Sequence, residues 1–341
     1  MSNSPTAVLS HHLGPNDWVE QARVTCRQGA KAVLVFVARH YGSTPRDKGS
    51  WMLVRPDASV GTLGGGEVER VVEAAARDML AARRPWTRVY EKFLLGPDMG
   101  QCCGGGMEVV FEPIDPPAMA WLDRAEQCLG QNNPGFVVIA WNKPEQAPTV
   151  NTAPLPDNMN AASGVHIQSL IDQRPSLVIY GSGHVARAFA AIAAQLPIRV
   201  TIVDDRRNEL DLVPLAANVS TVYMAYPLAH AEALDSANQA VLVMTYSHAL
   251  DYCLCLALLR NPDLAYIGLI GSKSKAARFR RRFEQDDGLS AAEIGRLVSP
   301  IGQGRISGKE PGLIALASLN EIMTELQRPL ARQQPQMSEN N

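Results

Sequence analysis

The sequence lacks the features that mark several large classes of protein. Its 341 residues include only six cysteines and no pair of C-x-x-C motifs, which argues against a disulfide framework and a zinc ribbon. Its 32 Lys and Arg nearly balance its 34 Asp and Glu, so the net charge of -2 predicts no nucleic-acid or membrane-surface partner. No apolar run approaches the roughly 18 residues of a membrane span, and the segment from Met1 to Gly14 lacks the pattern of a signal peptide. We therefore expect a cytoplasmic protein.

The length and composition predict two folded domains. The chain exceeds the size at which a single core stops growing, and its 46% hydrophobic and 19% charged residues are ordinary for a globular protein. Hydrophobic periodicity is lost where Pro, Asn, Ala and Ser accumulate, before the second half begins. The predicted organisation is an N-terminal domain over residues 1–142, a linker over 143–175, a Rossmann-like domain over 176–327 and a flexible tail over 328–341.

The N-terminal domain is expected to have a mixed α/β fold that carries two glycine loops. Short apolar runs rich in β-branched residues predict its strands, at residues 32–38, 51–54, 60–63, 89–95, 107–111 and 135–141. Apolar residues at helical spacing after Gly64, Gly65 and Gly66 predict a helix that leaves the first glycine loop. The second loop, residues 99–106, contains two adjacent cysteines.

The second half alternates apolar strands with helical stretches. The strands are expected at 177–180, 200–203, 240–244 and 265–269, and the helices near 185–195, 251–260 and 273–284. This alternation predicts a doubly wound parallel sheet, so the fold class of the whole chain is α/β.

A glycine-rich motif opens the second domain. Gly181 and Gly183 follow a strand and precede a helix, with His184 next and Ala186 at the position of the third glycine, as in a dinucleotide-binding fingerprint. Asp204 ends the following strand, where an acid that binds ribose is expected. The same glycines also suit the strand-to-helix turn of a Rossmann domain that binds no nucleotide, so both alternatives stay open.

The adjacent Cys102 and Cys103 are the second candidate for chemistry. Neighbouring cysteines have poor geometry for a disulfide or for chelating one zinc ion. The surrounding glycines leave the thiols unshielded, which suits a soft metal ligand or a persulfide carrier. A small buried cysteine beside a turn is the plain alternative.

Two further features have equally plain alternatives. His248 follows an apolar strand and could act in acid-base chemistry if Asp251 orients it, or could serve only as a loop hydrogen-bonding group. Arg46 and Lys48 could bind a phosphate or be solvated loop charges.

Several motifs, in order along nearly the whole chain, resemble those of the XdhC/CoxI accessory family. They are residues 42–49, 61–69, 100–105, 181–186, 247–251, 268–273 and 299–302. The segment 302–309 departs from the pattern of many relatives, so no role is assigned to it.

The resemblance implies a non-enzymatic or weakly catalytic chaperone that binds the molybdenum cofactor (molybdopterin). Such a protein protects the cofactor while a cysteine desulfurase supplies sulfur, and it delivers the cofactor to xanthine dehydrogenase, typically as a homodimer. The family's Cys-Gly-Gly falls on Cys103, Gly104 and Gly105, which makes Cys103 the candidate molybdenum ligand, with Cys102 beside it. Glu69 matches the acid after the triple glycine. The candidate cofactor-binding residues are therefore Cys102, Cys103, Gly104, Gly105, Gly64, Gly65, Gly66, Glu69 and Arg46, with Gly181, Gly183, His184 and Asp204 in the second domain.

Two rival functions remain at this point. One is an NAD(P)-dependent oxidoreductase that uses the Gly181 loop, and the other is a protein-interaction scaffold that binds no small molecule.

Overall fold

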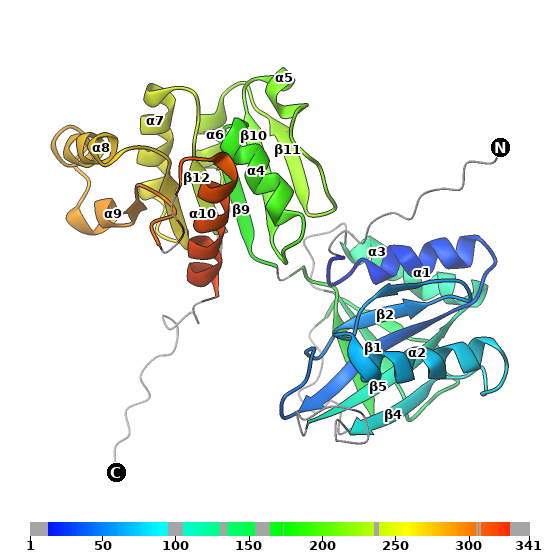
Figure 1. Cartoon of the computed structure of the whole chain (residues 1–341). Helices are drawn as coiled ribbons and strands as arrows, with labels where there is room; N and C mark the ends of the chain where they lie inside the picture. The colour runs from blue at the N-terminus through cyan, green and yellow to red at the C-terminus, as the bar shows by residue number, and fades with distance from the viewer. Residues whose placement is uncertain are drawn as a thin grey trace, which may run out of the picture. The chain divides into compact units, whose positions relative to one another are not determined.

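The chain folds into two compact units, Leu13–Gln173 and Arg174–Asn341, called here the first and second unit (Figure 1). The computed structural model describes residues 13–94, 105–129, 135–153, 164–172, 174–234, 239–304, 306 and 308–327. In these ranges no helix is both long enough and apolar enough to cross a bilayer. The first unit is mixed α/β and the second is a doubly wound parallel sheet, as the sequence predicts.

The first unit is built on a five-stranded antiparallel sheet with strand order β3-β2-β1-β5-β4. Helix α2 (Gly66–Leu80) packs on one face, and α1 (Trp18–Arg27) and α3 (Met119–Leu129) pack on the other (Figure 1). The central strand is buried on both faces, which explains its continuous apolar run. The strands are β1 (Ala32–Tyr41), β2 (Trp51–Val54), β3 (Ser59–Gly61), β4 (Val89–Leu94) and β5 (Gly106–Ile114).

A second, three-stranded sheet corrects the expected linker over 143–175. Strands β7 (Thr149–Asn151) and β8 (Val165–Ser169) both pair with β6 (Phe136–Ala140) and belong to the first unit. The residues of β8 that point inward are His166 and Gln168, which are polar. The apolar and polar residues of this strand do alternate, but the polar ones lie on the buried face, so the pattern is the reverse of that expected for a half-buried strand.

A buried ion pair ties the two sheets of the first unit together. Arg88 forms a bidentate pair with Glu112, and both side chains are at most 6% exposed. The guanidinium also donates to the carbonyl oxygens of Ala140 (2.7 Å), Lys143 (3.1 Å) and Gln146 (2.8 Å). These contacts hold the start of the expected linker against the first unit. Burial raises the pKa of Glu112, and the charge of Arg88 opposes that rise.

The second unit has six parallel strands in the order β11-β10-β9-β12-β13-β14. Helices α4 (His184–Ala193) and α10 (Pro311–Leu326) cover one face, and α7 (His248–Leu259) and α8 (Lys273–Gln285) cover the other. Two shorter helices follow the strands near the Gly181 loop and a third precedes the last strand, namely α5 (Arg207–Leu210), α6 (Pro227–Glu232) and α9 (Ala291–Gly295). The strands are β9 (Ser176–Tyr180), β10 (Arg199–Asp204), β11 (Val219–Tyr223), β12 (Gln239–Val243), β13 (Tyr266–Leu269) and β14 (Leu297–Val298).

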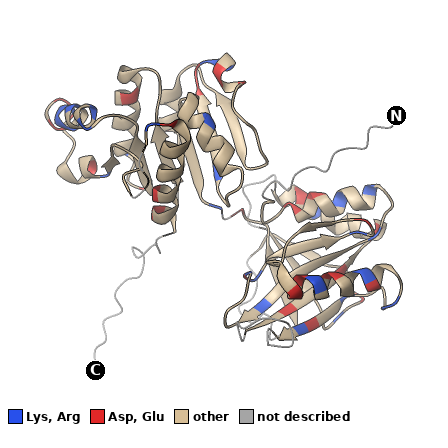
Figure 2. Cartoon of the chain, in the orientation of Figure 1, with Lys and Arg blue, Asp and Glu red and all other residues tan. Residues whose placement is uncertain are grey.

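Charged residues are distributed differently in the two units. Acidic and basic residues alternate along α2, whereas α8 carries a concentration of Lys and Arg (Figure 2). Within α8, Arg280 is half-buried and donates to the carbonyl oxygen of Leu297 at 2.9 Å. Part of this basic run therefore has a structural role.

Candidate functional site

The motif loops of the first unit meet at one edge of its main sheet. A Cβ atom added to Gly64 would lie 2.4 Å from Cβ of Pro45 and 3.2 Å from Cγ of Arg46. A Cβ atom added to Gly105 would lie 2.3 Å from the carbonyl oxygen of Ser43. Both glycines are therefore required by close packing against the loop that follows β1. We call this region the loop edge: residues 41–49, 62–66 and 105–106.

The first glycine loop is held in place by Glu69. One carboxylate oxygen of Glu69 accepts hydrogen bonds from Oγ1 of Thr62 (2.6 Å) and from the backbone N–H groups of Leu63 (2.6 Å) and Gly65 (3.0 Å). This oxygen satisfies backbone donors at the start of α2 that an anionic ligand would otherwise use. Glu69, expected from the family pattern to bind cofactor, therefore positions the loop.

The glycine loop keeps one open position. Gly65 has a φ of +73°, and a Cβ atom there would meet no heavy atom within 4 Å. Gly66 also has a positive φ, of +72°. The Cβ side of Gly65 is thus open, whereas its N–H donates to Glu69.

The two cysteine candidates belong to the second glycine loop, of which the structure describes only the end. Cys102, Cys103 and Gly104 lie outside the described residues, and the description resumes at Gly105. Of the remaining thiols, Cys255 is buried and Cys253 is exposed on α7. Within the described ranges, no three His, Cys, Asp or Glu side chains are grouped so that they could hold a metal ion.

The loop edge also borders a charged cluster that sequence reasoning missed. Glu108 is 4% exposed, and its carboxylate accepts a hydrogen bond from the hydroxyl of Tyr41. Nε of Arg39 lies 3.6 Å and Nζ of Lys92 lies 3.8 Å from its two oxygens. The register places Arg39 and Lys92 opposite Glu108 on the neighbouring strands. The signal that could have revealed the cluster was one charged residue in each of β1, β5 and β4, at positions that pair in the sheet.

The electrostatic balance of this cluster favours an ionised Glu108. Burial by itself raises the pKa of Glu108, but hydrogen bonds from Tyr41 and Tyr90, with the charges of Arg39 and Lys92, bring it below its ordinary value. The two cations also lie 5.2 Å and 5.0 Å from the centre of the Tyr41 ring. One carboxylate thus faces two cations, so the cluster has a net positive charge.

In the second unit, the Gly181 loop has the expected strand-turn-helix geometry. Gly181 has a φ of +107°, and a Cβ atom there would lie 2.4 Å from the carbonyl oxygen of Met244. Gly183 is the N-cap of α4, and a Cβ atom there would meet no heavy atom within 4 Å. His184 is exposed at the first position of the helix. The loop therefore packs tightly on β12 at Gly181 and is open at Gly183.

Asp204 is occupied by protein groups. Its carboxylate accepts from the N–H (2.8 Å) and hydroxyl (2.7 Å) of Ser182. It also accepts from the N–H (3.0 Å), Nε (2.9 Å) and Nη2 (2.8 Å) of Arg206. Burial opposes ionisation, but these hydrogen bonds lower the pKa of Asp204 to about 2. The acid expected to bind ribose thus anchors the glycine loop to β10.

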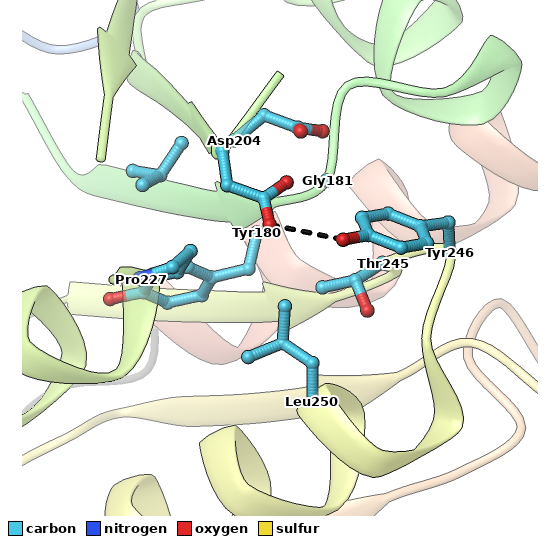
Figure 3. A pocket seen from close by; sticks show the side chains of 9 residues that line it. Tyr180, Gly181, Asp204, Pro227, Thr245, Tyr246 and Leu250 are labelled. Carbon is cyan, nitrogen blue, oxygen red and sulfur yellow. Dashed lines mark hydrogen bonds between the residues drawn. The ribbon is translucent and has the colours of Figure 1, made fainter. Parts of the chain in front are cut away.

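A pocket opens beside Gly181, where the order of the strands reverses (Figure 3). The space inside it that a water molecule can enter is about 10 Å³, far below the roughly 300 Å³ at which ligand pockets usually begin. Its lining is mainly aromatic and apolar, with two carboxylates on one side: Tyr180, Gly181, Val203, Asp204, Asp205, Pro227, Thr245, Tyr246 and Leu250. In this structure the pocket has room for about one water molecule and does not enclose a ring.

The expected partnership between His248 and Asp251 is wrong. Asp251 is 1% exposed and accepts from the N–H (3.0 Å) and hydroxyl (2.7 Å) of Thr245, and from Nζ of Lys275 (2.6 Å). His248 is exposed at the first position of α7. Helix geometry turns the side chain of Asp251 toward the core, where a buried carboxylate requires a cation.

Comparisons with known proteins cover both units. The family model described as the XdhC Rossmann domain matches residues 177–322, and the model described as the XdhC and CoxI family matches residues 25–91. The chain belongs to the XdhC/CoxI family. Residues 41–49 and 62–66 of the loop edge lie in the second matched region and the Gly181 loop lies in the first, whereas residues 105–106 of the loop edge lie outside both.

Two individual proteins are similar to the chain over most of its length. The Escherichia coli (strain K12) protein YqeB, described as uncharacterized, is 28% identical over 316 residues, which are 90% of this chain and 46% of YqeB. The chain therefore spans about half the length of that curated relative. A Bacillus halodurans structure described as a xanthine dehydrogenase has a TM-score of 0.73 at 19% identity, over 95% of this chain and 98% of the other. At that identity the likeness supports the shared fold.

Proposed function

We propose that this protein is an accessory factor in the maturation of xanthine dehydrogenase, and that it binds the molybdenum cofactor as cargo at the loop edge. In this proposal it protects the cofactor while a cysteine desulfurase supplies sulfur, and then delivers it to the dehydrogenase. The family membership supports the accessory role. The site is proposed from one observation: Gly64 and Gly105 pack against the same loop, so that three family motifs meet there.

The residues at the loop edge suit different parts of such a cargo. A pterin with a terminal phosphate needs cations: Arg46 supplies one within the loop edge, and Arg39 and Lys92 supply two more in the charged cluster that borders it. Gly65 lets the ring system approach the backbone. Cys103, two residues before Gly105 in the sequence, would supply a thiolate, and a thiolate is a soft ligand suited to a metal already bound by sulfur.

The test is cofactor retention by the full chain. Purified protein is mixed with molybdenum cofactor and separated by size, and the protein fraction is assayed for molybdenum and pterin. Cys103→Ala is expected to lose retained molybdenum, whereas Cys253→Ala, which removes an exposed thiol in the second unit, is expected to retain as much as the wild type. Equal retention by the two variants would remove Cys103 from the site.

A second pair of variants tests the cationic side of the loop edge. Arg39→Ala is expected to weaken cofactor retention, because a charge-assisted contact to a phosphate is lost. Arg83→Ala removes an arginine that is 76% exposed at the far end of α2, and it serves as the control. No retention by the wild type would refute cofactor binding itself. We also propose a homodimer, to be checked by light scattering of the purified chain.

A further inference from the structure

Exposed apolar and aromatic side chains gather at the β11 end of the second unit. Four of the five most exposed large hydrophobic side chains in the described ranges lie there: Leu212 (58%), Leu215 (66%), Tyr226 (79%) and Tyr246 (62%). Single exposed apolar residues are common, but a gathered set marks an interaction surface. We call residues 205–226 together with Tyr246 the β11 surface.

The contacts of the β11 surface show that its parts adjoin one another. Arg207, at the start of α5, has its guanidinium 3.7 Å from the ring centre of Tyr223 at the end of β11. Ala216 forms a bridge with Val219 at the start of β11. The segment 207–216 therefore runs along β11 and carries the two exposed leucines with it. Figure 1 shows α5 beside β11 at this end of the sheet.

Two tyrosine rings of the β11 surface are held in place by arginines. The hydroxyl of Tyr246 donates to Asp205 at 3.0 Å, and the guanidinium of Arg206 lies 4.4 Å from the centre of the same ring. Arg207 lies over Tyr223 in the same way. Side chains that are already fixed lose less conformational entropy on binding. Tyr and Arg are also among the residues that contribute most to protein interfaces, so the surface suits a protein partner.

A small ligand does not account for this surface. The pocket beside Tyr246 has only about 10 Å³ that a water molecule can enter. The side chains of Leu212, Leu215, Tyr223 and Tyr226 are not part of its lining. These side chains therefore face solvent at the end of the sheet and do not enclose a cavity.

The charges of the β11 surface are complementary to those of a second copy. Arg207 and Asp211 are both exposed, and neither forms an ion pair in the described part of the chain. The other charged residues of the surface do form ion pairs, namely Asp205, Arg206 and Glu209. In a two-fold dimer the same patch meets itself, so one free cation and one free anion can pair twice across the axis. By contrast, α8 exposes cations that would repel their own copies: Lys273, Arg278 and Arg281.

We propose that the β11 surface binds the same surface of a second copy of this chain. Leu212, Leu215 and Tyr226 form the apolar centre of the contact, and Arg207 of each protomer pairs with Asp211 of its partner at the rim. This inference rests on the homodimer proposed above and names the surface that forms it. It does not depend on cofactor binding at the loop edge.

Sedimentation equilibrium of the full chain measures the dissociation constant of the dimer. Leu215→Ser should raise that constant about tenfold or more, because an apolar contact at the centre of the interface is lost from both protomers. Leu94→Ser is the matched control, since Leu94 is 68% exposed in the first unit, and it should leave the constant unchanged. A monomeric wild type would overturn both this inference and the homodimer. Equal constants for the two variants would overturn the surface and leave the homodimer standing.

Two charge reversals test the pairing across the two-fold axis. Arg207→Asp and Asp211→Arg each place like charges opposite one another, so each variant alone should dimerise about tenfold or more weakly than the wild type. An equimolar mixture of the two variants restores opposite charges at both pairs, so heterodimers should form more tightly than either variant alone. Arg278→Asp, on α8, should leave the dissociation constant unchanged. Association that stays as weak in the mixture would overturn the pairing and would indicate that another protein occupies the surface.

Discussion

Replacing Gly64 by alanine tests whether close packing assembles the loop edge. Gly64 has a φ of +107°, a conformation that costs a residue with a side chain about 1–3 kcal/mol. The added Cβ atom would also lie 2.4 Å from Cβ of Pro45, and such overpacking costs about 1–3 kcal/mol more. Gly65→Ala is a matched control, because Gly65 also has a positive φ but its Cβ atom would meet no neighbour within 4 Å. The two variants share the strain of a positive φ, so the overpacking cost should be the main difference between them.

Differential scanning calorimetry of the full chain measures this difference. For a domain of about 160 residues, each kcal/mol lowers Tm by about 2–4 °C, so Gly64→Ala should unfold at least about 2 °C below Gly65→Ala. Gly64→Ala should also retain less molybdenum cofactor at a temperature where both variants are folded, because its loop is pushed away from Arg46. Equal Tm values for the two variants would show that the contact with Pro45 does not constrain the loop.

Three further substitutions test structural roles assigned above. Arg88→Ala should destabilise the first unit by about 3–5 kcal/mol in urea unfolding, because Glu112 stays buried without its cation, whereas Arg84→Ala, in a more exposed pair, should cost about 1 kcal/mol or less. The pKa of Asp204 is lowered to about 2, so the ionised carboxylate stabilises the second unit by about 2 kcal/mol above about pH 4. This stabilisation is lost as the pH falls toward 2, and Asp204→Asn should remove this acid sensitivity from the second unit. Glu69→Leu should cost about 1–3 kcal/mol by leaving backbone N–H groups unsatisfied, and an unchanged Tm would contradict the positioning role.

The regular elements could be predicted where a single local pattern reports them. The strand at residues 32–38 is a continuous apolar run because both faces of β1 are covered, and the helix after Gly66 shows apolar residues at helical spacing. β8 could not be found in this way, because its buried residues are His166 and Gln168. Their burial depends on a partner strand nearly thirty residues earlier in the chain, which local periodicity does not report.

In the candidate sites, too, some features follow from a local sequence pattern and others depend on contacts in the folded protein. The glycines at positions 64, 105 and 181 are visible in the sequence, and the structure supplies the reason for each, a neighbouring backbone or side chain within 2.4 Å of the missing Cβ atom. The roles of the acids were not visible. Glu69 and Asp204 resemble ligand-binding groups, but one oxygen of Glu69 and both oxygens of Asp204 accept hydrogen bonds from the protein's own donors.

The sequence by itself determined the α/β class, the parallel sheet of the second unit and the positions of the glycine turns, because each of these follows from hydrophobic spacing or from the backbone freedom of single residues. Only the tertiary structure decided which charged groups remain available to a ligand. A carboxylate binds the nearest strong donors whatever their separation in the chain, so Asp204 pairs with Ser182, Asp251 with Lys275, and Glu108 with Arg39 and Lys92. Those pairings are set by distances between folded segments, which the order of residues along the chain does not contain.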